Sequence, residues 1–258
     1  MQSFCEATDL GLNRDNNEDA ILSEPALGLW LVADGMGGHA AGEVASELTK
    51  TIIRESVKKG LSLSDAIHNA HQSIIDATYN DNSKRGMGST VVALQTLKTQ
   101  FRIAWVGDSR AYLWRLGEDG DASFSQLTTD HSYVQMLFQS GAISAEEMVH
   151  HPEKNIITQC LGSTELETVE VDEVAQPWQA GDKILLCSDG LTDVVSDQAI
   201  CDILFENQQS DQAVPKLIQR ALESRARDNI SVILVDAPTE ESGLNMLWQT
   251  LRTRLKRE

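Results

Sequence analysis

The sequence predicts an α+β fold: an antiparallel β-sandwich flanked by helices on both sides (α-β-β-α layers), with a flap subdomain. Short apolar runs rich in β-branched or aromatic residues are bounded by Gly, Asp or Ser, which is typical of buried strands. Longer segments repeat apolar residues with helical spacing. Because strands and helices do not alternate one by one, packed antiparallel sheets are favoured over a doubly wound parallel sheet.

Apolar runs of four to six residues are predicted as strands. They occupy residues 29–33, 91–94, 101–106, 111–114, 183–187 and 231–235. The runs at 91–94, 101–106 and 111–114 are separated by short turns at 98–100 and 108–109. We therefore expect these three to form an antiparallel meander.

Amphipathic patterns predict helices at 41–59, 64–78 and 212–224. Residues 131–163 differ, with short helical pieces and a glycine hinge at Gly141, and are predicted to be a flap over a site. We expect a single domain over 1–237, then a short linker and a C-terminal amphipathic helix within 238–258. That helix, with its leucine stripe and basic end, either packs on the domain or docks a partner or an anionic membrane surface.

The composition restricts the possible partners. The formal net charge is −18 and the pI about 4.6, so the surface repels nucleic acid and anionic membranes. A protein of this charge that handles phosphate needs local positive charge from a bound metal or a well-placed arginine. The start of the chain lacks a signal-peptide pattern, no apolar run is long enough for a transmembrane segment, and the four cysteines are scattered. We expect a cytoplasmic protein with free thiols.

Carboxylates recur at the ends of predicted strands. Asp34, Asp108 and Asp189 each follow a buried run, and Asp228 precedes another. An Asp-Gly after a strand is also an ordinary turn, and any one instance alone favours that interpretation. Their joint occurrence, together with Asn17-Glu18-Asp19, favours a cluster neutralised by hard cations such as Mg²⁺ or Mn²⁺. Two ions that share a carboxylate can activate water and hold a phosphoryl oxygen.

An ordered set of motifs spans roughly residues 6–236. It comprises RDNNEDA at 14–20, VADGMGGHAAGE at 32–43, GMGST at 86–90, VGDSRAY at 106–112, LTTDHS at 127–132, HPEKN at 151–155, CSDGLTD at 187–193 and RDNIS at 227–231. The set resembles the bacterial form of the metal-dependent protein phosphatase family (PPM), the type 2C Ser/Thr phosphatases. The resemblance implies that 1–237 is a phosphatase catalytic domain and that 131–162 is the family's flap.

The resemblance also implies a metal centre with two ions, Mg²⁺ or Mn²⁺. Asp34 resembles the carboxylate that bridges both metals, and Gly35 would give its backbone carbonyl to one of them. Asp189 and Asp228 resemble ligands of the other metal, so Asp34, Asp189 and Asp228 are the expected catalytic residues. Asp108, with Asp189, matches the position of a third, weaker metal site.

Three further positions follow from the same resemblance. Glu18 and Asp19 would hold metal-bound waters, and Arg14 would bind the substrate phosphate, a task that suits a bidentate guanidinium. The implied reaction is hydrolysis of phosphoserine and phosphothreonine in proteins by a metal-bridging hydroxide, without a phosphoenzyme. The expected partners are phosphorylated proteins and a bacterial Ser/Thr kinase that the enzyme opposes.

Two positions depart from the family pattern. Met36 stands where eukaryotic relatives have a histidine that is a candidate general acid, which leaves His39 as a nearby candidate for that role. Lys154 stands where relatives often have arginine. Two other functions stay open: a phosphatase-like scaffold without turnover, and a metal-dependent hydrolase of small phosphoesters or nucleotides.

Overall fold

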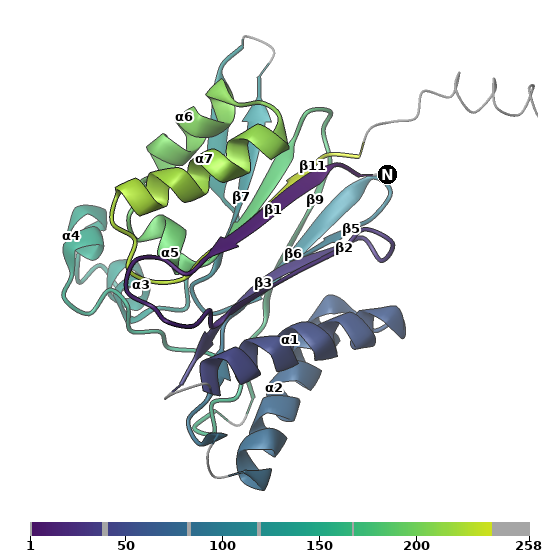
Figure 1. The fold of residues 1–258 in the computed structure, drawn as a ribbon, viewed down its shortest axis with the longest axis vertical. Coiled ribbons are helices and arrows are strands. Elements are labelled where there is room, and N and C mark those ends of the chain that lie inside the picture. The colour runs from purple at the N-terminus through teal and green to yellow at the C-terminus, as the bar shows by residue number, and fades with distance from the viewer. Residues whose placement is uncertain (1, 38–40, 82–83, 118–119, 167, 239–258) are drawn as a thin grey trace, which may run out of the picture.

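The computed structural model describes residues 2–37, 41–81, 84–117, 120–166 and 168–238. Two antiparallel sheets lie face to face in the middle of the molecule (Figure 1). One sheet has the order β1 (Phe4–Asp9), β11 (Ile230–Asp236), β10 (Lys183–Cys187), β7 (Arg110–Leu116) and β8 (Ala122–Gln126). The other has the order β2 (Asp19–Glu24), β3 (Leu29–Met36), β5 (Val91–Thr96), β6 (Gln100–Val106) and β9 (Asp172–Pro177), with β4 (Gly88–Ser89) paired to the end of β3.

Helices cover the outer face of each sheet. Helices α1 (Ala41–Lys58) and α2 (Leu63–Asn80) lie on the β3 side, and α6 (Asp197–Glu206) and α7 (Ser210–Glu223) lie on the β1–β11 side (Figure 1). Short helices α3 (Tyr133–Gln139), α4 (Ala145–His150) and α5 (Asp189–Thr192) lie at one edge. The predicted α-β-β-α layers and the predicted helices at 41–59, 64–78 and 212–224 are therefore confirmed.

Strand β3 shows why the sequence folds into layers. Leu29, Leu31 and Ala33 belong to the apolar cluster under α1 and α2. Trp30 and Val32 belong to the cluster between the two sheets. Because successive side chains of a strand point to opposite faces, an unbroken apolar run suits a strand that is buried on both sides.

The predicted meander is wrong in one respect. β5 and β6 pair as expected, but β7 lies in the other sheet, between β10 and β8, while β6 pairs with β9. Gly107, with φ of +105°, and the adjoining Asp108-Ser109 carry the chain from one sheet to the other. The short turn between β6 and β7 favoured a hairpin of these two strands. In the structure they belong to opposite sheets, and both contribute residues to the apolar cluster between the sheets.

The flap is closed at its base by backbone contacts. Isolated bridges join Ser132 to Ile157 and Ser89 to Leu161. Helix α4 begins with a capping box, in which the Ser144 hydroxyl and the Glu147 carboxylate each accept a backbone N–H. The segment 131–163 lies next to α5 (Figure 1), and its role as a flap stays a prediction.

Two further predictions concern membrane spans and the C-terminal segment 238–258. No helix in the described ranges is long and apolar enough to span a membrane. The predicted C-terminal helix lies outside the described residues, which end at position 238. The domain boundary at 237 stays a prediction.

Candidate active site

Carboxylates from both sheets meet at one end of the sandwich. Asp19 and Asp34 are direct partners in the β2–β3 ladder. Asp108 lies between β6 and β7, Asp189 begins α5 directly after β10, and Asp228 lies just before β11. The crossover at Asp108, which places β7 in the opposite sheet, brings these segments to the same end of the sandwich.

Burial and the charges of neighbouring aspartates both raise the pKa values of these carboxylates. Burial raises the pKa of Asp34 well above its usual value, and the charges of Asp19 and Asp189 raise it further. Burial, followed by the charge of Asp108, raises the pKa of Asp189 in the same direction. Burial and the charge of Asp130 raise the pKa of Asp108 to about 6. Such a cluster favours neutralisation by bound cations.

Asp19 is oriented by a hydroxyl on the facing sheet. The Ser188 hydroxyl donates to Asp19 Oδ2 at 2.8 Å and accepts the Ser231 backbone N–H at 2.9 Å. Burial raises the pKa of Asp19 to about 6, although the hydrogen bonds from Ser231 and Ser188 oppose this rise. Ser188 therefore ties β2 to the junction of β10 and β11.

Glycines bring the Gly35 carbonyl and the Glu18 carboxylate together. A Cβ at Gly42 would lie 2.6 Å from Glu18 Oε1 and 2.8 Å from the Gly35 carbonyl oxygen. A Cβ at Gly35 would lie 2.0 Å from the Gly42 carbonyl oxygen. The Gly35 N–H also donates to the Glu18 carbonyl at 3.1 Å. Only glycine at both positions allows this approach, which gathers two oxygen ligands beside Asp34.

Arg14 lies at the mouth of the aspartate cluster. Its guanidinium donates to Asp228 Oδ2 at 2.7 Å and approaches Glu18 Oε2 at 3.7 Å. The side chains of Arg14 and Asp228 are 45% and 43% exposed, so both can exchange partners with solvent or a ligand. The arginine predicted to bind phosphate is thus held at the cluster by a carboxylate that is itself a predicted metal ligand.

Asn229 is an organising residue that the sequence reasoning did not assign. Its side-chain oxygen accepts the Glu18 N–H at 2.8 Å, and its amide donates to the carbonyls of Leu10 at 3.0 Å and Asn16 at 3.1 Å. Asn229 is only 3% exposed. It therefore fixes the loop that carries Arg14 and Glu18 against the strand that follows Asp228. Its place inside RDNIS was the available signal.

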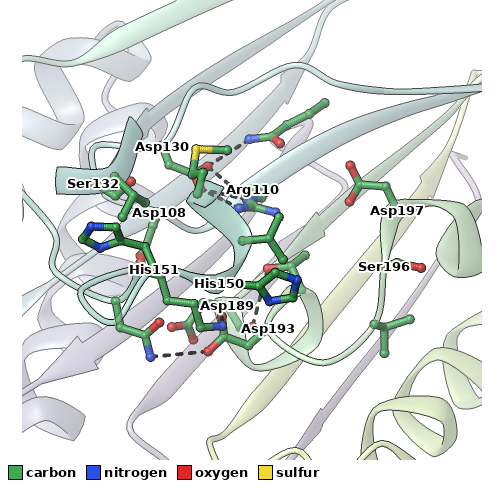
Figure 2. Close-up of a pocket in the computed structure, with 18 of the residues that line it drawn as sticks. Asp108, Arg110, Asp130, Ser132, His150, His151, Asp189, Asp193, Ser196 and Asp197 are labelled. Carbon is green, nitrogen blue, oxygen red and sulfur yellow. Dashed lines mark hydrogen bonds and ion pairs between the residues drawn. The ribbon is translucent and has the colours of Figure 1, made fainter. Parts of the chain in front are cut away.

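Residues of the flap segment and two members of the aspartate cluster line a cavity of about 850 Å³ (Figure 2). Asp108 and Asp189 line it, together with His150 and His151 of the flap. Lys154, where the sequence departs from the family's arginine, donates to Asp193 at 2.8 Å. This pair joins the flap to the residue that follows α5.

Arg110 also lines this cavity. Its Nε and Nη2 atoms contact the Asp130 carboxylate at 2.7 to 3.0 Å, a bidentate pair. Arg110 Nη1 also donates to the Tyr112 hydroxyl at 3.1 Å, and that hydroxyl donates to Asp197 at 3.1 Å. Arg110 is thus already neutralised by the protein. No motif singled out this pairing in advance.

The last of the predicted site residues is not among the residues that the structure describes. His39, the candidate general acid, falls among residues 38–40, which the structure does not describe. Met36 ends β3 and lines a second groove, of about 590 Å³, which shares no lining residue with the flap cavity.

The described residues fit hard divalent cations. Buried Asp189 Oδ1 has no hydrogen-bond partner, and the Gly42 cradle gathers oxygens of Gly35 and Glu18. All these donors are oxygens, the ligands that Mg²⁺ and Mn²⁺ prefer. Within the described ranges, no three His, Cys, Asp or Glu side chains are arranged closely enough to be a closed metal cluster by themselves. Backbone carbonyls and water would have to complete the coordination.

Comparisons with known proteins identify the family of the chain. The family model for protein phosphatase 2C matches residues 3–135 and 170–230. The chain is 36% identical over 249 residues to "Serine/threonine phosphatase stp" of Listeria welshimeri, covering 92% of this chain and 96% of that protein. It is 36% identical over 247 residues to "Serine/threonine protein phosphatase PstP" of Mycobacterium tuberculosis, covering 93% of this chain and 46% of that protein.

Solved structures show the same similarity. A crystal structure of the M. tuberculosis phosphatase PstP superposes with a TM-score of 0.82 at 33% identity, covering 91% of this chain and 98% of that one. A structure of the PstP catalytic domain "in complex with 2 Manganese ions" gives a TM-score of 0.78 at 32% identity, covering 91% and 97%. The chain belongs to the protein phosphatase 2C family, whose members are Mg²⁺- or Mn²⁺-dependent serine/threonine protein phosphatases.

Proposed function

We propose that this phosphatase uses two Mg²⁺ or Mn²⁺ ions to hydrolyse phosphoserine and phosphothreonine in proteins by direct attack of an activated water on phosphorus. Bound divalent cations would lower the pKa of that water and neutralise the phosphoryl oxygens. The observation that carries the proposal is the convergence of Asp34 and Asp189, whose partly buried carboxylates both have raised pKa values. Such carboxylates are poorly stabilised as anions until a cation binds.

The proposed ligands follow from position and environment. Asp34 and the Gly35 carbonyl would hold one ion, and Asp34, Asp189 and Asp228 the other. Glu18 and Asp19 would position water on these ions, since Glu18 lies in the Gly42 cradle and Asp19 is oriented by Ser188.

A third ion is proposed between Asp108 and Asp189. Both line the flap cavity, and the charge of Asp108 is the largest electrostatic cause of the raised pKa of Asp189.

Arg14 is the proposed phosphate-binding residue. Its guanidinium is partly exposed and can give up one carboxylate contact to receive a phosphoryl oxygen. The substrate would thus lie between Arg14 and the ions. His39 stays the proposed proton donor to the leaving oxygen.

Hydrolysis of a phosphothreonine peptide with Mn²⁺, with Mg²⁺ and with EDTA tests the proposal. We expect phosphate release with either metal and none with EDTA. Faster hydrolysis of nucleotides than of phosphopeptides would instead favour a small-phosphoester enzyme. Mn²⁺ binding without release of phosphate from any substrate would favour a scaffold.

We propose that the enzyme acts in the cytoplasm and reverses the products of a bacterial Ser/Thr kinase. Deletion of its gene should raise total protein phosphothreonine in the source cell, and an Asp34→Asn copy should not restore the original level. An unchanged phosphothreonine level would contradict this role.

A further inference from the structure

A second cavity lies beyond the end of β3 that carries Asp34. This groove, of about 590 Å³, is lined by Met36 of β3, by Tyr79 at the end of α2, and by Arg85 and Gly88. Met36 pairs with Gly88 in the β3–β4 ladder, directly beyond the Gly35–Ser89 pair. Since a strand advances about 3.3 Å per residue, the groove begins about 7 Å along the backbone from Asp34.

Arg85 differs from the other cations near the site. Arg14 is held by Asp228, Arg110 by Asp130 and Lys154 by Asp193. Across the described ranges, Arg85 is the one arginine or lysine lining either cavity that has no hydrogen bond or ion pair. In a chain of net charge −18, an exposed arginine that has no carboxylate partner among the described residues can contact an anion. Arg85 lines a groove that begins at Met36, two residues along β3 from Asp34.

An exposed aromatic ring and an exposed carboxylate also line the groove. Tyr79 is 76% exposed and offers an aromatic surface on the groove wall. Glu165, another lining residue, is exposed, and no contact joins it to Arg85.

We propose that this groove binds the chain flanking the phosphorylated residue and that Arg85 selects an anionic group there. The anion is a carboxylate of a flanking Asp or Glu, or a second phosphate. The inference rests on the proposed phosphoprotein substrate. An extended peptide spans at most about 3.6 Å per residue, so the selected anion lies within a few residues of the phosphorylated position.

A phosphothreonine peptide with neutral flanks provides the test. Glu, Gln, Arg or phosphoserine is placed at each flanking position in turn, and kcat/KM is measured with Mn²⁺ for the wild type, Arg85→Gln and Arg85→Lys. Lys216→Gln, an exposed change on α7, is the matched control. A small aryl phosphate reports the chemical step without the groove.

We expect the wild type to prefer Glu over Gln at one or two positions by about fivefold, as an exposed charge contact allows. Arg85→Gln should abolish that preference, Arg85→Lys should keep part of it, and neither should change hydrolysis of the aryl phosphate. A larger effect of phosphoserine than of Glu would identify the phosphate as the selected anion.

Other results would overturn the inference. The wild type could show no preference for Glu or phosphoserine, or it could prefer Arg. The preference for Glu could also remain in Arg85→Gln, or Arg85→Gln could lose as much activity on the aryl phosphate as on the peptide. Hydrolysis of the neutral peptide is read separately. If the neutral peptide is hydrolysed but kcat/KM does not depend on the flanking residues, the proposed function is supported and the proposed role of Arg85 is wrong.

Discussion

Two walls flank the aspartate cluster, and they are built from different contacts. The glycine wall consists of Gly35, Gly42 and Gly190, where a Cβ would lie 2.0 to 2.6 Å from backbone or carboxylate atoms of the site. The flap wall meets the residue after α5 through the Lys154–Asp193 ion pair, in which both side chains are 35% exposed. Backbone in contact with backbone cannot relax, whereas exposed ion pairs exchange readily with water. Substitutions on the first wall should therefore cost far more activity than those on the second.

Asp34→Asn tests the centre that both walls serve and should have the largest effect. We expect kcat/KM to fall by about a thousandfold or more, because the carboxylate shared by both ions is lost. Burial and neighbouring carboxylates raise the pKa of Asp34, so its charge disfavours folding when no metal is bound. The metal-free variant should therefore melt no lower than metal-free wild type, and Mn²⁺ should stabilise the variant less.

Calorimetry with and without Mn²⁺ measures both parts of this prediction. Saturating metal at about 100 times its dissociation constant adds about 2.7 kcal/mol to the stability of a protein with one site. If the Asp34→Asn variant gains as much stability from Mn²⁺ as the wild type, Asp34 is not a metal ligand.

Gly42→Ala tests the rigidity of the glycine wall. The added Cβ would meet Glu18 Oε1 at 2.6 Å and the Gly35 carbonyl at 2.8 Å, so one of these oxygens must move. We expect a loss of about 10- to 100-fold in activity or Mn²⁺ affinity, the usual effect of disturbing the support of a metal site. Gly117→Ala is the control, since its Cβ would come no closer than 3.2 Å to the Asp121 carbonyl. Equal activities of the two variants would contradict a rigid wall.

Asn229→Ala tests the loop that carries Arg14 and Glu18. Three hydrogen bonds to Glu18, Leu10 and Asn16 would be lost from a residue that is 3% exposed. Unpaired buried groups cost about 1–3 kcal/mol, so thermal unfolding should occur at lower temperature. The freed loop should no longer hold Arg14 in place for the phosphate. A loss of substrate-binding energy near the lower end of this range would raise KM for phosphopeptide by about tenfold.

The control for this prediction is Asn69→Ala on α2, whose amide makes one long bond of 3.4 Å to Ser56. It should leave KM unchanged. A rise in KM for Asn69→Ala that matches the rise for Asn229→Ala would mean that lost stability, not the loop, explains the effect.

These effects bear on what the sequence could predict. Buried strands such as β3 and β10 are continuous apolar runs, and the aspartates that end them are visible in the same stretch. The sequence reasoning missed five strands, which are β1, β2, β4, β8 and β9. β1, β8 and β9 lie at sheet edges, where exposed and partly buried residues are mixed. β2 is also an edge strand with one buried residue, and β4 has only two residues. A half-solvated strand carries a weaker apolar signal.

The site was predictable where the chemistry lies in local motifs, and it was not where contacts are long-range. Asn229 and Leu10 are 219 residues apart, and Arg110 and Asp130 are 20 apart. Nothing in local spacing tells which carboxylate neutralises which arginine. For the same reason, only the structure could show that Arg85 has no ion-pair partner among the described residues.

The Lys154–Asp193 pair tests the flap wall, where we expect the smallest effect. Because both side chains are 35% exposed, Lys154→Met and Asp193→Asn should each change phosphopeptide kcat/KM by less than about fivefold. A double-mutant cycle should give a coupling energy of about 0.2–1 kcal/mol that shrinks as salt is added. A coupling of several kcal/mol that salt does not change would mean that the flap is closed rigidly, and the contrast between the two walls would fail. A small, salt-sensitive coupling would instead leave the flap free to open for a folded substrate while the glycine wall holds the metal ligands in place.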